Sequence, residues 1–384
     1  MHLHSRDFFA STALAAGGIV AGLAVAGLVT ATAAEPPRRR VDVHLYGADG
    51  SPGGPHAAWY RDIGITDVWI YPVAGAFPQD QLPETQKTPA DLVREGTLAA
   101  YERHGIRSWW FERPVPDFLY RVGRQPTPGV DPAAPLTRHI WDSSPETDAL
   151  WQGVCDRIAE VYPAVRDARF AGVVYDGEAY YNGAGPAPAA GSAPSPWLWG
   201  HDEEAGSEGN YYRRGLQIGR AIHAAWPEAR VILVYAFGYA CERWWYQGIH
   251  DAGVKVLIGP EHTYGAGPGD LGKAWFQQWW DGKPTKQVCD SKRSEFPFVR
   301  DNRQVIAGLF PINFGTGKPN YRARDFEKQL ASAANDDAEP IGVWLWPEGP
   351  FTPQRWREIE CAEGDSAEAY LAALRAYSTA HGAR

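Results

Sequence analysis

Eight short apolar segments of strand type recur along the chain, and helical stretches fit between most of them. The segments cover residues 41–46, 67–71, 106–111, 170–175, 231–236, 254–258, 305–310 and 341–346. Alternation of strands with helices is typical of α/β proteins with a parallel sheet. Eight such units in a chain of 384 residues predict a single (β/α)8 barrel of the TIM type.

A doubly wound open sheet is the alternative fold. Such sheets often carry a glycine-rich turn after the first strand, with the spacing G-x-G-x-x-G. Here Tyr46 is followed by Gly-Ala-Asp-Gly-Ser-Pro, which lacks that spacing. We therefore predict one barrel domain over residues 35–384.

The helical stretches and the loops between them give the barrel its expected outer layer. The clearest helical patterns cover residues 88–104, 144–162, 208–226 and 322–334, and shorter ones cover 241–252 and 270–281. A long insert rich in Gly, Pro, Ala and Ser follows strand four, at residues 182–210. Because loops at the C-terminal ends of barrel strands form the active face, this insert is expected to lie over that face.

Polar and aromatic residues share one parity in five of the eight predicted strands. In the first strand, Asp42, His44 and Tyr46 alternate with apolar residues. Since strand side chains alternate between two sides, this parity predicts the barrel interior. The other residues of this parity are Asp67, Trp69, Tyr71, Val174, Asp176, Glu178, Lys255, Leu257, Glu261, Trp344, Trp346 and Glu348.

Residues 1–34 are typical of an export signal peptide. A short segment containing Arg6 precedes a long apolar run, and small residues up to Ala34 offer a cleavage site. The twin-arginine route and the general secretory route stay open, as does an uncleaved anchor. We expect cleavage, a secreted or extracytoplasmic protein, and no stable membrane insertion after cleavage.

Composition restricts the partners. The formal charge of −9 argues against nucleic acid, whose phosphates need a basic surface. The 17 Trp and 18 Tyr residues are suited to sugar rings, although most of them are expected to fill the core. We expect a monomer with a carbohydrate substrate and no cofactor.

Four cysteines remain after the signal: Cys155, Cys241, Cys289 and Cys361. Export permits disulfides, and four cysteines allow three pairings. No two of them form a close C-x-x-C pair, which argues against a zinc site. A chain of this size does not need disulfides, so Cys155 can equally be a buried free thiol.

Two carboxylates follow strand four, and further acids follow other strands. Asp176 and Glu178 are two residues apart, so they point to the same side. Their proximity is expected to raise one pKa, which suits a general acid. Acids that converge on one barrel mouth are the arrangement that glycoside hydrolysis requires.

The segment Phe170-x-Gly172-Val-x-Tyr-Asp176-x-Glu178 resembles the strand-four motif of family 18 glycoside hydrolases, the chitinase-like barrels. The resemblance implies that Glu178 is the general acid and that Asp176 assists it. It extends to the Trp-bearing last strand, but the acids earlier in the motif are replaced by Ala171 and Val174. We therefore expect a barrel glycosidase and not a chitinase.

The second catalytic carboxylate is less clear, because Asn313 follows strand seven where many barrel glycosidases carry an acid. Glu261 is the preferred candidate, and Glu348 and Asp176 are alternatives. The expected catalytic residues are thus Glu178, Asp176 and Glu261. The expected substrate-binding residues are Trp69, Tyr71, Trp110, Glu112, Trp346 and Glu348.

Two other functions stay open. A barrel that binds carbohydrate without cleaving it would keep the aromatics, but its acids would be ion-paired. A metal-dependent hydrolase is suggested by Asp42-x-His44. No second histidine pair completes such a site, so we expect His44 to be an interior histidine and predict no metal.

Overall fold

The computed structural model describes most of the chain after the N-terminal segment. The described residues are 41–48, 50–70, 87–112, 143, 145–176, 209–234, 240–260, 285–309, 311–313, 318–319, 321–334, 342–345, 351–361 and 363–381. The chain divides into two units, Met1–Arg38 and Arg39–Arg384, and every described residue belongs to the second. The predicted signal peptide lies outside the described residues.

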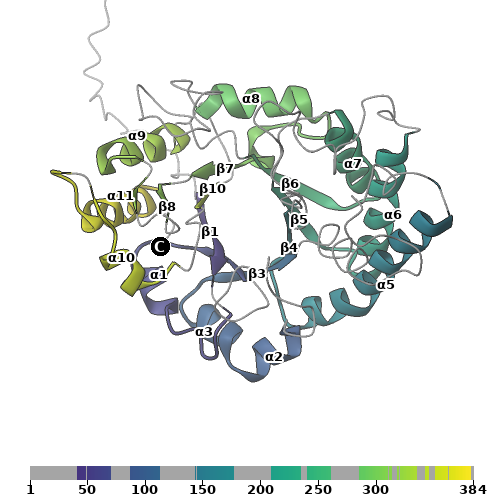
Figure 1. The fold of residues 1–384 in the computed structure, drawn as a ribbon, viewed down its shortest axis with the longest axis horizontal. Coiled ribbons are helices and arrows are strands. Elements are labelled where there is room, and N and C mark those ends of the chain that lie inside the picture. The colour runs from purple at the N-terminus through teal and green to yellow at the C-terminus, as the bar shows by residue number, and fades with distance from the viewer. Residues whose placement is uncertain are drawn as a thin grey trace, which may run out of the picture. The chain divides into compact units, whose positions relative to one another are not determined.

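Eight parallel strands form the centre of the fold, and they lie where the sequence predicts them. They are β1 (Asp42–Ala48), β2 (Asp67–Ile70), β3 (Arg107–Glu112), β4 (Val173–Asp176), β5 (Arg230–Val234), β6 (Lys255–Gly259), β7 (Ile306–Leu309) and β10 (Gly342–Leu345). Their order in the sheet is β6-β5-β4-β3-β2-β1-β10-β7. A parallel bridge between Ile258 and Val305 joins the two outermost strands and brings the sheet round into a barrel. The predicted (β/α)8 fold is confirmed (Figure 1).

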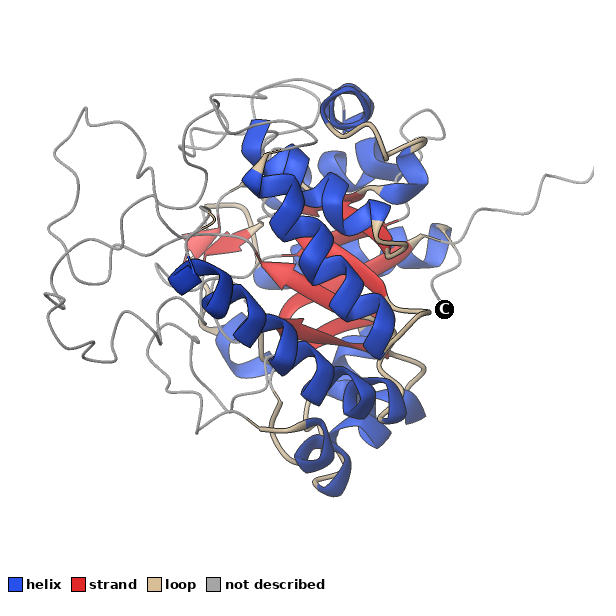
Figure 2. Ribbon diagram, turned by 90° about the vertical axis from the view of Figure 1, so that its right-hand side faces the viewer, coloured by secondary structure: helices blue, strands red, loops and turns tan. Residues whose placement is uncertain are grey.

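Helices surround the strands, as Figures 1 and 2 show from two directions. They are α1 (Ala57–Asp62), α2 (Pro89–Arg94), α3 (Thr97–Arg103), α5 (Pro145–Asp167), α6 (Asn210–Ala225), α7 (Ala240–Asp251), α8 (Thr285–Glu295), α9 (Ala323–Ala334), α10 (Pro353–Arg357) and α11 (Ala367–Ala380). A short antiparallel pair, β8 (Ile312–Asn313) and β9 (Lys318–Pro319), follows β7. Among the described helices, none has the length and apolar character to cross a membrane.

The helix predicted over residues 88–104 is in fact two helices. Thr88 and Asp91 form a capping box that starts α2. Gly96 then adopts a φ of 74°, a left-handed conformation that ends one helix before the next begins. The amphipathic pattern continues across this break, because α2 and α3 both bury residues against the same barrel.

One other helix prediction differs from the structure in its length. The stretch predicted to end at Tyr162 continues to Asp167, so Pro163 lies inside α5. A proline removes one backbone hydrogen bond from a helix, and the packing of α5 against the barrel outweighs that loss. The sequence did not predict α8, and the stretch predicted at residues 270–281 lies outside the described residues.

The buried side chains form two separate groups. The larger group lies between the strands and the helices. The smaller group fills the barrel, and it consists of Tyr46, Trp69, Trp109, Phe111, Val174, Ile232, Val234, Leu257, Ile306, Tyr321 and Trp344. Its described members on β1, β2, β4, β6 and β10 have the parity that the sequence predicts for the interior.

The packing of the Trp109 ring requires a residue without a side chain at position 172. A Cβ atom added at Gly172 would lie 2.5 Å from the Trp109 ring and 2.4 Å from the Arg230 carbonyl oxygen. Real Cβ atoms do not approach other atoms so closely, so the Trp109 ring requires glycine here. Gly172 in the strand-four motif thus has a packing role.

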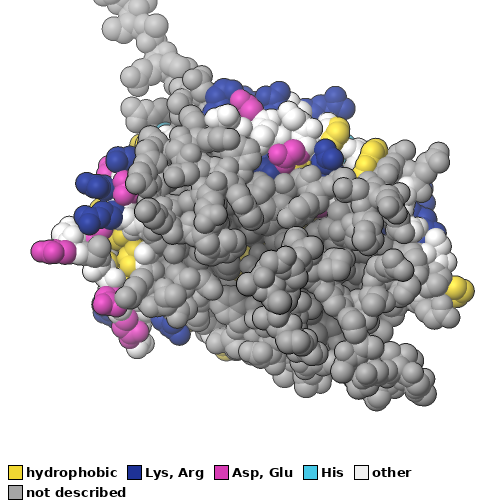
Figure 3. Space-filling view, turned by 45° about the horizontal axis from the view of Figure 1, so that its top comes forward, with side chains coloured by type: hydrophobic (Ala, Val, Ile, Leu, Met, Phe, Trp, Pro, Cys, Tyr) yellow, Lys and Arg dark blue, Asp and Glu magenta, His cyan; other side chains and the backbone are white. Residues whose placement is uncertain are grey.

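The described surface carries both signs of charge. Figure 3 shows basic and acidic side chains next to one another along the upper edge of that view. Exposed pairs such as Lys255–Glu228, at 2.8 Å, have this mixed character. Solvent screens such exposed pairs, so they add little to the stability of the fold.

Three of the four cysteines are free thiols in the structure. Cys155 and Cys289 are buried, and Cys361 is partly exposed. Burial raises the pKa of Cys155 to about 11 and that of Cys289 to about 12, so both thiols stay protonated and unreactive near neutral pH. The expectation that Cys155 is a buried free thiol is confirmed.

Candidate active site

The C-terminal edge of the barrel is where the sequence places the catalytic acids. β4 ends at Asp176, which pairs with Val234 at the end of β5, and Val234 pairs in turn with Gly259 at the end of β6. The last residues of β4 and β6 are therefore in register, with one strand between them. The predicted residues Glu178, Glu261, Tyr71, Trp346 and Glu348 lie outside the described residues, as does the side chain of Asp176.

Aromatic rings fill the barrel below this edge. The ring of Tyr46 lies 4.9 Å from that of Phe111 and 5.8 Å from that of Trp344, measured between centroids. Trp69 and Trp344 lie 5.3 Å apart. Such spacings are typical of aromatic pairs in direct contact. The rings leave a packed interior, so a ligand of the barrel would have to bind above them, toward the C-terminal ends of the strands.

Trp69, a predicted sugar contact, belongs to this packed interior. Its side chain is 0 % exposed. Its indole Nε1–H donates a hydrogen bond of 3.1 Å to Nδ1 of His44. The parity prediction for Trp69 is confirmed, but its surroundings give it a packing role and leave no surface for a sugar.

Trp110 and Glu112 lie on the outer side of β3, toward the helices. The Trp110 ring packs edge-on against Phe170, with 5.6 Å between centroids. The Glu112 carboxylate accepts a hydrogen bond of 2.9 Å from the hydroxyl of Tyr162 on α5. Both side chains are buried. The structure therefore turns these two predicted substrate contacts away from the barrel interior.

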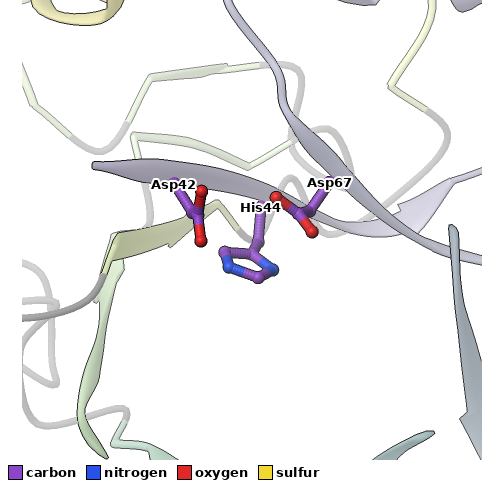
Figure 4. Close-up of side chains that lie close together, drawn as sticks. All are labelled: Asp42, His44 and Asp67. Carbon is purple, nitrogen blue, oxygen red and sulfur yellow. The ribbon is translucent and has the colours of Figure 1, made fainter. Parts of the chain in front are cut away.

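At the opposite end of the strands lies a group of charged residues that we call the lower cluster: Asp42, His44, Asp67 and Arg107. Asp42, Asp67 and Arg107 are the first residues of β1, β2 and β3, at the N-terminal end of the barrel. Figure 4 shows the His44 ring between the two carboxylates, and their possible ligand atoms lie within 4.8 Å of one another. Within the described residues, this is the group that could hold a metal ion.

Hydrogen bonds and ion pairs already hold the carboxylates of the lower cluster. Arg107 contacts the carboxylates of Asp67 and Asp42 at 2.7 and 2.8 Å. Asp67 also accepts hydrogen bonds from Thr66 and from Trp109 Nε1, each of 2.7 Å. Its carboxylate is thus held by three donors.

His44 offers no lone pair to a metal in this arrangement. An indole N–H only donates, so Nδ1 of His44 must accept from Trp69, and the neutral ring then carries its hydrogen on Nε2. Metal binding at either nitrogen would require loss of a hydrogen bond or of a proton. A guanidinium between the two carboxylates further opposes a cation. The residues of the lower cluster do not fit a metal centre.

The pKa shifts agree with a neutral histidine. Burial lowers the pKa of His44 below its ordinary value of 6.5, and the neighbouring arginines act in the same direction. Burial alone would raise the pKa of Asp67. With His44 neutral, the charge of Arg107 and the hydrogen bonds from Arg107 and Trp109 are what lower the pKa of Asp67. The lower cluster is an ion pair network around a neutral imidazole.

The structure also brings in residues that sequence patterns did not select. Tyr321, which precedes α9, joins the interior aromatic group from a segment that is not a barrel strand. Arg230, the first residue of β5, lies over the Trp109 ring with 5.2 Å to the centroid. Arg230 shares its parity with Ile232, which offered a signal for an interior position. Tyr321 does not belong to a strand, so the alternation of strand side chains gives no prediction for it.

Comparisons with known proteins give matches at the level of fold. No protein-family model matches the sequence, and no curated protein matches it. Among solved structures, the chain is similar to a family 138 glycoside hydrolase that targets pectin rhamnogalacturonan II. The TM-score is 0.46 at 9 % identity, and the match covers 90 % of this chain and 39 % of that one.

Two further structures have similar values. One is a family 18 N-acetylglucosaminidase from Paenibacillus barengoltzii, with TM-score 0.45, 12 % identity, and coverage of 88 % of this chain and 99 % of that one. The other is a family 113 β-1,4-mannanase, with TM-score 0.47, 9 % identity, and coverage of 89 % and 99 %. Similarity at this level carries no information about substrate or catalytic residues. The family 18 resemblance at residues 170–178 stays a prediction.

Proposed function

We propose that this chain is a glycoside hydrolase that acts on a polysaccharide or glycoconjugate at the C-terminal edge of its barrel. The observation that supports it is the register of β4 and β6. Asp176 and Gly259 are in register through Val234 of β5, and Glu178 and Glu261 each follow two residues later in the sequence. Two carboxylates that leave strand ends at one level on the same mouth suit two-carboxylate catalysis.

In this proposal Glu178 is the general acid, Asp176 tunes its pKa, and Glu261 is the second carboxylate. One strand separates β4 from β6, so their axes are about 10 Å apart, and side chains that lean inward come closer. This spacing is compatible with retention, at about 5–5.5 Å between carboxyl groups, and with inversion, at about 6.5–9.5 Å. The stereochemistry of the product separates the two mechanisms.

The substrate contacts of the proposal are Tyr71, Trp346 and Glu348. Tyr71 directly follows β2, and Trp346 directly follows β10. The aromatic faces would stack on sugar rings, and Glu348 would accept hydrogen bonds from hydroxyl groups. Trp69, Trp110 and Glu112 are left out of this set because of their buried packing.

The test is hydrolysis of a panel of aryl glycosides and polysaccharides by the wild-type protein and by Glu178→Gln. Loss of a general acid is expected to reduce kcat about 10²–10⁴-fold, with little change in substrate affinity. Binding of a sugar by both proteins without hydrolysis by either would favour the non-catalytic alternative. Unchanged turnover by Glu178→Gln would remove Glu178 from the acid role.

Export belongs to the same proposal. We infer that residues 1–34 direct the chain out of the cytoplasm and are then removed, as their charge and apolar pattern predict. Expression of the full chain in a bacterial host, followed by fractionation and N-terminal sequencing, tests this. A mature chain that begins at Glu35 outside the cytoplasm supports it, and retention of Met1 or of cytoplasmic protein contradicts it.

A further inference from the structure

A second buried polar group lies on the outer side of β3 and β4, at their C-terminal ends. We call it the strand-end network: Glu112, Tyr162 and Tyr175. Glu112 is the last residue of β3, and it pairs in register with Tyr175 on β4. Tyr162 on α5 reaches both, with 2.9 Å from its hydroxyl to Oε2 of Glu112 and 2.5 Å to the hydroxyl of Tyr175. One helix residue thus joins the ends of two adjacent strands.

The direction of these hydrogen bonds follows from their chemistry. A carboxylate only accepts, so the Tyr162 hydroxyl donates its one hydrogen to Glu112 and must accept from Tyr175. Burial, together with the Glu112 carboxylate, raises the pKa of both tyrosines well above 10, so both hydroxyls keep their hydrogens. Arg157 on α5 lies 3.4 Å from Glu112 and balances its charge. The network is therefore complete and directional.

Stability alone is a weak reason for this network. The three side chains are buried among apolar residues of the larger core. Burial of a carboxylate is costly, and apolar side chains of similar size usually stabilise such a position as well or better. The location of the network offers a different reason, because it lies at the strand end from which Asp176 and Glu178 follow.

We propose that the strand-end network positions the acids that follow β4. Tyr175 points outward, and the residues on either side of it have the opposite parity in the strand. A tether on Tyr175 thus fixes the rotation of the end of β4, from which the chain continues to Glu178. A displacement of about 1 Å at a reacting group costs up to about 10²-fold in rate. This inference rests on the proposed function, because positioning matters only where these acids carry the chemistry.

Tyr162→Phe and Tyr175→Phe test the proposal, since each removes one hydroxyl and keeps the ring. Tyr60→Phe is the matched control: its buried hydroxyl donates a hydrogen bond of 2.6 Å to the Phe351 carbonyl, away from β3 and β4. The first measurement is hydrogen exchange of peptides that cover residues 170–178. Loss of one buried hydrogen bond is expected to speed exchange there about tenfold in the two network variants and to leave it unchanged in Tyr60→Phe.

The second measurement separates positioning from a general loss of stability. On the substrate with the highest wild-type turnover, the network variants are expected to lose about tenfold in kcat with KM within about twofold. Glu112→Gln keeps an oxygen that accepts from Tyr162, so its kcat should fall less than that of Tyr162→Phe. Glu112→Leu has no acceptor and should resemble Tyr162→Phe.

The outcomes are distinct. The first outcome concerns the rate of hydrogen exchange at residues 170–178. If this rate increases no more in Tyr162→Phe than in Tyr60→Phe, the positioning role is wrong, whether or not the protein hydrolyses a glycoside. Faster exchange with an unchanged kcat overturns it as well. A wild-type protein that hydrolyses no member of the panel overturns the proposed function, and the catalytic part of this inference with it.

Discussion

The lower cluster and the strand-end network are both buried and polar, yet they differ in what surrounds them. The lower cluster lies inside the barrel at the first residues of its strands, and Arg107 contacts two carboxylates there. The strand-end network lies outside the barrel at the last residues of β3 and β4, and its main members are hydroxyl groups. Because barrel enzymes act at the C-terminal ends of strands, the proposed function gives the two groups different roles: stability for the lower cluster and positioning for the strand-end network.

The largest loss of stability is expected for Arg107→Met, which removes the cation of the lower cluster. The substitution leaves Asp67, which is 0 % exposed, without its cation. Removing one partner of a buried ion pair typically costs about 3–5 kcal/mol. We expect a loss near the lower limit in the free energy of unfolding by urea, because Arg107 is itself partly exposed. Arg107→Lys keeps the charge and should lose less; equal stability of Arg107→Met and wild type would contradict the role of the cluster.

A smaller effect is expected for Trp69→Phe. The variant keeps an aromatic ring in the interior but removes the hydrogen bond to His44. Trp110→Phe is its control, because the Trp110 Nε1–H has no hydrogen-bond partner among the described residues. Both variants lose ring volume. In Trp69→Phe the lost hydrogen bond lowers the free energy of unfolding by about 1 kcal/mol more. Thermal or urea unfolding measures this difference, and a Trp110 variant that is the less stable of the two would contradict it.

The smallest effect is a pH dependence of stability from His44. Its pKa is lowered in the folded protein, so acid protonates the unfolded chain first and favours it. The stabilisation is complete above the ordinary value of 6.5 and declines as the pH falls through that value toward the lowered one. His44→Gln keeps an acceptor for Trp69 and cannot titrate. The wild-type protein should therefore lose more unfolding free energy than His44→Gln between pH 8 and pH 5, so that the difference between them becomes smaller. A difference that stays constant over this range would contradict a neutral His44.

The strands were predictable because their signal is local. Alternation along β1 and β2 placed Asp42, His44 and Trp69 inside the barrel correctly, since side-chain period and burial agree there. The roles of individual residues were less predictable. Trp110 and Glu112 were chosen for their residue types, but their parity turns them toward α5 and the helix layer.

The contacts that define the two polar clusters join distant parts of the sequence. Glu112 and Tyr162 are 50 residues apart, and Trp109 and Asp67 are 42 apart. Nothing in the local pattern of α5 distinguishes Tyr162 from an ordinary core tyrosine. Such pairs depend on the closure of the barrel and on strand register. Neither of these can be predicted from the sequence of a single segment.

The most direct test of the central claim compares carboxylates from the two ends of the barrel. Glu178→Gln and Asp42→Asn each replace an acid by its amide, and kcat for both is measured on the same glycoside. The account predicts a loss of about 10²–10⁴-fold for Glu178→Gln. Asp42→Asn should keep kcat per folded molecule within about twofold and lower only the stability. A kcat that falls in Asp42→Asn but not in Glu178→Gln would contradict the assignment of chemistry to the C-terminal end.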